Sequence, residues 1–99
     1  MQLVHLHYWA GARAAAGMVE ETVSAATVED ALRQVSDRRA NPHFERVIRA
    51  STLLIDEVPA READLSRTLV RPVRVEILPP FAGGERSISF DLQPIRARL

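Results

Sequence analysis

The chain has 99 residues, 46% hydrophobic and 26% charged, which is typical of one small globular domain. Thirteen basic residues, all arginine, balance thirteen acidic ones, and this zero net charge disfavours a nucleic-acid partner. The absence of cysteine excludes disulfides, thiolate metal sites and cysteine nucleophiles. No apolar run is long enough to span a bilayer and the first residues lack a signal-peptide pattern, so we expect a cytoplasmic protein.

The N-terminal part of the chain predicts two strands. Residues 2–9 alternate between apolar and polar side chains, which is the pattern of a half-buried strand. The side chains expected on its buried face are Val4, Leu6 and Tyr8. Residues 11–17 are bounded by glycines and predict a short helical turn or loop. Residues 18–24 predict a second strand, because Val19 and Val23 are β-branched and the polar residues between them can face water.

The next segment carries the clearest helix signal. Thr27 is a good N-cap, and the acidic residues Glu29 and Asp30 suit the positive end of the helix dipole. The apolar stripe at helical spacing consists of Val28, Ala31, Leu32 and Val35. Asn41-Pro42 ends this helix, and residues 44–48 indicate a second, short one.

The C-terminal part predicts further strands. Residues 52–58 form one, residues 59–67 are polar and predict a loop, and residues 73–78 alternate strongly before a double proline. After the following glycines, the apolar residues of 88–92 alternate again, which predicts an added C-terminal strand.

This order of elements predicts a single α+β domain with a mixed sheet packed on one main helix. The right-handed crossover rule places the last core strand next to the first and parallel to it. That is the ubiquitin-like β-grasp arrangement, although the pattern by itself leaves a ferredoxin-like or other α+β sheet open. We expect the domain to cover residues 1–84, with residues 85–99 as a C-terminal extension.

The motif of most interest is a Gly-Gly pair on a proline-stiffened arm that follows a strand. Glycine lets such an arm enter a narrow channel and adopt backbone angles closed to other residues. The motif lies in the last of five segments that together resemble one protein family. These segments are WAGAR (9–13), AG (16–17), TVEDAL (27–32), LIDE (54–57) and VEILPPFAGG (75–84). On these segments the chain resembles the MoaD/ThiS sulfur-carrier family over about residues 3–84, most closely the small subunit of molybdopterin synthase.

The resemblance implies a sulfur carrier that is not itself an enzyme and binds no cofactor. An adenylating (E1-like) enzyme would use ATP to activate the carboxylate of Gly84, which would become a thiocarboxylate and donate sulfur within the catalytic subunit of molybdopterin synthase. The residues implied to contact these partners are Pro80, Phe81, Ala82 and Gly83, with Arg13, Arg74 and Glu76 as polar contacts at the rim.

Two departures from the family pattern stand out. Residues 69–72, Leu-Val-Arg-Pro, replace an acidic turn that bears glycine, and the chain continues after Gly84, where family members typically end. An amide-bonded Gly84 has no carboxylate to attack ATP, so a protease would first have to remove residues 85–99. The alternative is a β-grasp module that does not carry sulfur and binds partners through its surface or its added strand, including a homodimer formed by strand exchange. Sulfur-transfer pathways other than molybdopterin synthesis also remain open.

Other polar residues of the sequence are candidate sites. His5, His7 and His43 are possible zinc ligands, but two histidines on the solvent face of a strand are a simpler interpretation, and we expect no metal site. The acidic pairs Glu20-Glu21 and Asp56-Glu57 do not face each other on a strand, and we expect them to be solvated surface.

Overall fold

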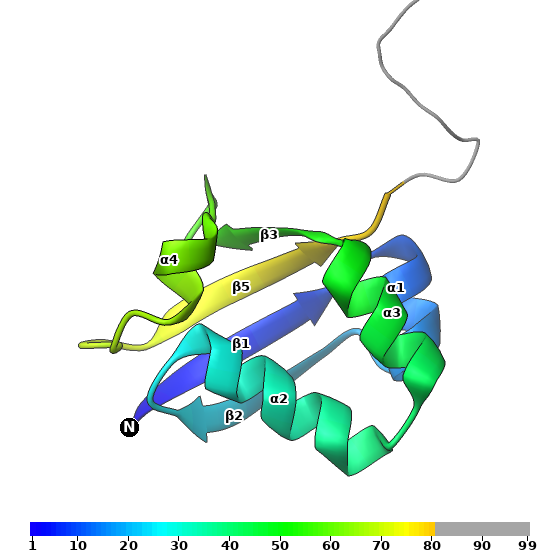
Figure 1. Ribbon diagram of the computed structural model, residues 1–99, viewed down its shortest axis with the longest axis horizontal. Helices are drawn as coiled ribbons and strands as arrows, with labels where there is room; N and C mark the ends of the chain where they lie inside the picture. The colour runs from blue at the N-terminus through cyan, green and yellow to red at the C-terminus, as the bar shows by residue number, and fades with distance from the viewer. Residues whose placement is uncertain (81–99) are drawn as a thin grey trace, which may run out of the picture.

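The computed structural model describes residues 1–80, and Figure 1 shows one mixed sheet with helices on one of its faces. The strands of this part of the chain are β1 (Gln2–Tyr8), β2 (Glu20–Ala25), β3 (Thr52–Ile55), β4 (Val58–Pro59) and β5 (Val73–Leu78). The helices are α1 (Ala10–Ala16), α2 (Val28–Arg39), α3 (Pro42–Ala50) and α4 (Glu62–Leu65). The strand order is β2-β1-β5-β3-β4.

The central pair of the sheet confirms the predicted topology. β1 and β5 are parallel neighbours, with Val4 opposite Val73 and Tyr8 opposite Ile77, whereas β2 and β3 pair antiparallel with them. The crossover between the two central strands contains α2 and α3, which lie over the same face of the sheet (Figure 1). The fold is therefore the α+β ubiquitin-like β-grasp fold that the sequence predicted.

The core lies between this sheet and α2 and α3. The inward side chains of β1, Val4, Leu6 and Tyr8, are at most 1% exposed, as the alternation predicted. The other buried side chains that meet them include Val28, Ala31 and Val35 of α2, Phe44 of α3, and Val75 and Ile77 of β5. Leu32 packs only at the margin of this cluster and is half-buried.

Helix α2 begins and ends as local chemistry requires. The Thr27 hydroxyl accepts the backbone N–H of Asp30 at 2.9 Å, which satisfies one of the unpaired donors of the first turn. At the other end, Ala40 adopts a left-handed conformation with φ 50°, and its N–H bonds the Ser36 carbonyl. Asn41 then caps α3 through its side chain, and Pro42 occupies the first helical position.

Three predicted boundaries were wrong. The strand predicted for residues 52–58 ends at Ile55, because Asp56 and Glu57 adopt positive φ values of 50° and 72° and form a two-residue turn into β4. The segment predicted as loop at 59–67 contains the single-turn helix α4. β2 begins at Glu20, two residues later than predicted.

The prediction that Glu20-Glu21 is solvated was wrong for Glu21. Its carboxylate is 10% exposed and pairs with Arg38 at 3.0 Å and with Arg39 at 2.8 Å, and it accepts the hydroxyl of buried Tyr8. The Arg39 guanidinium also lies over the ring of Phe44, 4.6 Å from its centroid. Burial raises the pKa of Tyr8, and the hydrogen bond to Glu21 raises it further. This ion cluster joins the end of α2 to the sheet.

The predicted extension at 85–99 and the strand predicted at 88–92 lie outside the described residues, as does the boundary at residue 84. Within residues 1–80, no helix is long and apolar enough to cross a membrane.

Candidate partner-binding site

The arm, residues 79–84, begins where the central strand β5 leaves the sheet. Leu78 forms the last pair of β5, with Thr52 of β3. Pro79 and Pro80 lack the N–H groups that would continue the ladder, and their fixed φ keeps the chain extended. Pro79 is half-buried and Pro80 is exposed. The two prolines therefore carry the chain away from the end of the sheet, beside α1 and α3 (Figure 1).

A shallow hollow of about 330 Å³ lies beneath the start of the arm. Its lining residues are Gly11 of α1, His43, Arg46, Val47 and Ala50 of α3, and the two prolines Pro79 and Pro80. A methyl group built on Gly11 would meet the Pro79 ring at 4.0 Å, an ordinary van der Waals contact. Pro79 thus lies beside α1 at the point where the chain leaves the sheet.

Of the predicted partner-contact residues on the arm, only Pro80 lies within the described part of the chain. Pro80 is exposed at the start of the arm, where a partner could contact it. Phe81, Ala82, Gly83 and the predicted reactive residue Gly84 lie outside the described residues. Their roles stay predictions.

The face of the sheet opposite the helices, called the outer face below, bears polar side chains, one indole and the leucines Leu3, Leu54 and Leu78. Side chains of β1 that alternate with the core residues point there, and the parallel register places His5 opposite Arg74 and His7 opposite Glu76. Trp9 follows at the end of β1 and is 46% exposed. Its backbone N–H bonds the Ile77 carbonyl at 3.1 Å, so the indole lies beside the end of β5 from which the arm leaves.

The Glu76 carboxylate is the centre of a hydrogen-bonded cluster on this face. Its Oε1 accepts the indole Nε1–H of Trp9 at 2.7 Å and Nδ1–H of His7 at 2.8 Å, and its Oε2 accepts Nε–H of Arg74. The His7 ring also meets the Trp9 ring edge to face, with centroids 4.7 Å apart. Because a carboxylate only accepts, the hydrogen bond assigns the His7 proton to Nδ1.

The environment of Glu76 favours its charged form. Partial burial opposes ionisation, but the hydrogen bonds from Trp9, Arg74 and His7, together with the positive charge of Arg74, outweigh it. They lower the pKa of Glu76 from 4.5 to about 2. Glu76 therefore remains a carboxylate, and a strong acceptor for the indole, at neutral pH.

The sequence pattern predicted that His5 and His7 share one face of a strand, and the family resemblance implied that Arg74 and Glu76 are polar contacts at a rim. Neither predicted that His7, Trp9 and Glu76 meet. The missing information was the register of β1 and β5, because alternation fixes which face a side chain points to but not which residue it meets. His5 bonds the hydroxyl of Thr22 at 2.8 Å.

Within residues 1–80, no group of three or more histidine, aspartate or glutamate side chains is placed to hold a metal ion. His43, the third histidine weighed as a ligand, lies in α3 on the helix side of the sheet.

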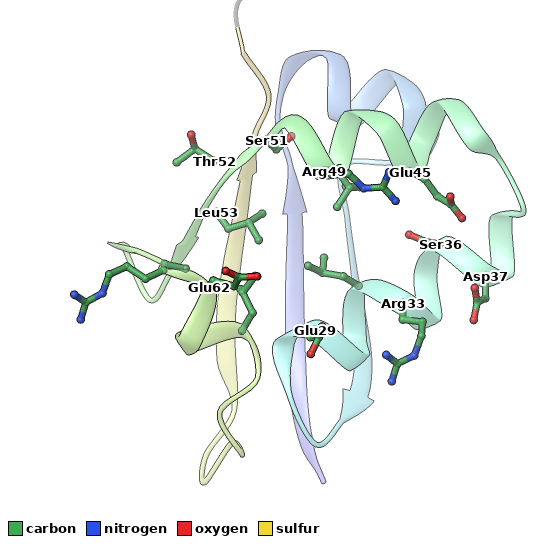
Figure 2. Close-up of a pocket in the computed structure, with 15 residues that line it drawn as sticks. Glu29, Arg33, Ser36, Asp37, Glu45, Arg49, Ser51, Thr52, Leu53 and Glu62 are labelled. Carbon is green, nitrogen blue, oxygen red and sulfur yellow. The ribbon is translucent and has the colours of Figure 1, made fainter.

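A hollow of about 860 Å³ lies on the helix side, away from the outer face. Its apolar floor is made by Leu32, Ile48, Leu53 and Leu65. Figure 2 shows charged side chains from α2, α3 and α4 around it, among them Glu29, Arg33 and Glu62. With both signs of charge at the rim, the groove favours no particular class of charged ligand.

The mixed sheet and the helices that cover one of its faces define a ubiquitin-like β-grasp protein. No family model and no curated protein matches the chain. Among solved structures, it is similar to the small archaeal modifier protein 1 of Methanosarcina acetivorans, with 27% identity and a TM-score of 0.70 over 85% of this chain and 98% of that one.

Two further solved structures match at the level of fold. The putative molybdopterin converting factor subunit 1 of Pyrococcus furiosus has 18% identity and a TM-score of 0.65, over 82% of this chain and 100% of that one. A chain in the complex of subunits 1 and 2 of the molybdopterin-converting factor of Helicobacter pylori has 13% identity and a TM-score of 0.59, over 83% of this chain and 99% of that one. These neighbours confirm the resemblance that the sequence indicated.

Proposed function

We propose that the protein is a sulfur carrier whose Gly84 carboxylate, once exposed, is converted to a thiocarboxylate and donates sulfur in molybdopterin synthesis. The observation that carries the proposal is the arm: the central strand β5 runs directly into Pro79-Pro80 and the chain leaves the sheet towards Gly-Gly. The similarity in fold to the molybdopterin converting factor subunit 1 supports the same function.

The chemistry requires a free carboxylate. A carboxylate oxygen of Gly84 would attack the α-phosphorus of ATP and release pyrophosphate, and a sulfide equivalent would then displace AMP from the acyl-adenylate. In this proposal the adenylating partner catalyses these steps, and residues 1–80 catalyse none of them. The Helicobacter pylori complex of subunits 1 and 2 supports a catalytic subunit as the partner that receives the arm. We expect this chemistry to take place in the cytoplasm, where ATP is available.

Hydrolysis of the bond between Gly84 and Glu85 must come first. In the full chain this carbonyl is an amide, whose resonance makes it a poor acyl donor. About 15% of this chain lies outside the region matched by the archaeal modifier, which supports an added segment relative to that protein. We therefore include a processing protease among the partners.

The test compares the full chain with a version that ends at Gly84. Each is incubated with ATP, a sulfide source and the adenylating enzyme of the same organism, and intact-mass spectrometry detects the exchange of one oxygen for sulfur. We expect thiocarboxylate only on the shorter chain. Loading of the uncut chain, or no loading of the chain that ends at Gly84, would contradict the proposal.

A second candidate function is favoured by the 27% identity to a protein named as a modifier. The same activated Gly84 carbonyl would then acylate lysine amines of other proteins, with AMP as the leaving group. Mass spectrometry of tryptic peptides from the native cell would find lysines that carry a remnant of the Gly-Gly arm. A binding module that leaves Gly84 unused predicts neither product, and full-length chain as the only species in the cell would favour it.

A further inference from the structure

We propose that Glu76 holds Trp9 in a fixed orientation as the anchor through which the protein docks onto the adenylating enzyme. The inference rests on the proposed function, because the docking partner is the enzyme that would activate the Gly84 carboxylate. It concerns Trp9 and Glu76 on the outer face, which the sequence did not predict to form one partner contact.

The Trp9 indole is fixed from three directions. Its backbone N–H is bonded to Ile77, its indole N–H to Glu76, and its ring is in edge contact with His7. Despite these contacts it is 46% exposed. A large aromatic ring that is both immobilised and exposed loses little conformational entropy when a partner covers it, which is the property of a binding hot spot.

Trp9 is not an isolated apolar side chain. Met18 and Val19, which precede β2, are 43% and 47% exposed. The Val19 carbonyl accepts the backbone N–H of Tyr8, so both residues lie at the end of the sheet where Trp9 is found, but Val19 is opposite the inward-facing Tyr8 and does not share a face with Trp9. Trp9 and the neighbouring Met18 are called the anchor patch below. The patch adjoins the arm, because Ile77, which bonds Trp9, precedes Pro79 by two residues.

This arrangement specifies the chemistry of the partner. The indole N–H is already used by Glu76, so the part of the ring that remains exposed requires an apolar pocket and no hydrogen-bond acceptor. Next to it, the half-exposed Arg74 guanidinium bonds Glu76 through one of its five N–H donors. The matching surface is an apolar pocket with a carboxylate at its rim, beside the channel that receives the arm.

The first experiment observes Trp9 directly in the full chain. Trp9 is the only tryptophan of the sequence, so incorporation of 5-fluorotryptophan gives one ¹⁹F resonance. We expect this resonance to shift or broaden when the adenylating enzyme is added at concentrations at which gel filtration shows a complex. An unchanged resonance in a complex that has formed would overturn the proposal. Self-association of the chain in the absence of enzyme, seen by gel filtration and abolished by Trp9→Ala, would also overturn it by identifying a second copy as the occupant.

The second experiment measures the steady-state kinetics of thiocarboxylate formation on the chain that ends at Gly84. Trp9→Ala should raise KM about 30-fold or more and leave kcat within about two-fold, because it removes a docking contact and leaves the arm intact. Glu76→Gln should raise KM about five-fold if the held orientation of the indole falls to about a fifth of the population. The anisotropy decay of Trp9 fluorescence in free Glu76→Gln should show a faster component, which a general loss of stability would not produce.

Asp30→Asn is the matched control for Glu76→Gln. Asp30 is a partly buried carboxylate that accepts hydrogen bonds from Arg33 and Gln34, but it lies in α2 on the helix side. Its KM should equal that of the wild type. An equal rise in KM for Asp30→Asn and Glu76→Gln, or wild-type KM for Trp9→Ala, would refute the proposal. If the wild-type chain ending at Gly84 is not loaded at all, the proposed function fails, and the ¹⁹F experiment on the full chain still decides whether Trp9 is covered.

Discussion

Replacement of Glu76 by glutamine should change the pH dependence of folding stability. The wild-type carboxylate has a pKa lowered to about 2 by hydrogen bonds from Trp9, Arg74 and His7 and by the charge of Arg74, against the opposing effect of partial burial. A glutamate in the unfolded chain titrates near its ordinary value, so folding favours the ionised form. Glutamine does not ionise, so the variant lacks this pH-dependent contribution to folding stability.

The sign and the size follow from this difference. Because the folded pKa is lowered, the stabilisation is complete above the unfolded value near 4.5 and is lost as the pH falls towards about 2. A fall of this size corresponds to at most about 3.4 kcal/mol, and solvent at the outer face reduces the expected contribution to about 1–2 kcal/mol. The difference in free energy of unfolding between the wild type and Glu76→Gln should therefore be about 1–2 kcal/mol larger at pH 7 than at pH 2.5.

Urea unfolding followed by circular dichroism between pH 7 and pH 2.5 measures the difference. Ser24→Ala is the control, because Ser24 is an exposed and non-titrating residue on β2, and its difference from the wild type should not depend on pH. The loss of neutral hydrogen bonds in Glu76→Gln adds a constant offset, so the pH-dependent part is the result that matters. A wild-type advantage that stays constant between pH 7 and pH 2.5 would refute this account of Glu76.

Three further predictions concern the core and α2, each measured as the change in the free energy of unfolding in urea. Arg39→Ala should destabilise the protein by about 2–3 kcal/mol, because it leaves the nearly buried Glu21 carboxylate without one of its two arginine partners; a loss below 0.5 kcal/mol would contradict the role of this ion pair. Thr27→Ala should cost about 1 kcal/mol by removing the cap on the Asp30 N–H, and no change would show that the cap is not formed in solution. Ala40→Gly should stabilise the protein by about 0.5–1 kcal/mol, because Ala40 has a φ of 50° that glycine adopts without steric cost; destabilisation would argue against this helix end.

Particular residues show which structural features the local sequence pattern could predict. The alternation of Val4, Leu6 and Tyr8 gave the buried face of β1, and Thr27 gave the start of α2, since both depend on neighbours in the sequence. The break of the strand at Asp56 was not visible in this way. Its positive φ accompanies bonds to Arg74 of β5, whose backbone N–H its carboxylate accepts at 2.9 Å, and such contacts are made only after the sheet assembles.

The amino-acid sequence by itself determined the fold class and where the arm begins, because hydrophobic periodicity, caps and the double proline act within a few residues. Only the tertiary structure decided that Glu21 is enclosed by arginines and that Trp9, His7 and Glu76 form one cluster. Trp9 and Glu76 are 67 positions apart, and they meet because β1 and β5 pair in one register out of several that the same alternation allows. That register is selected by how the whole core packs, which no local segment encodes.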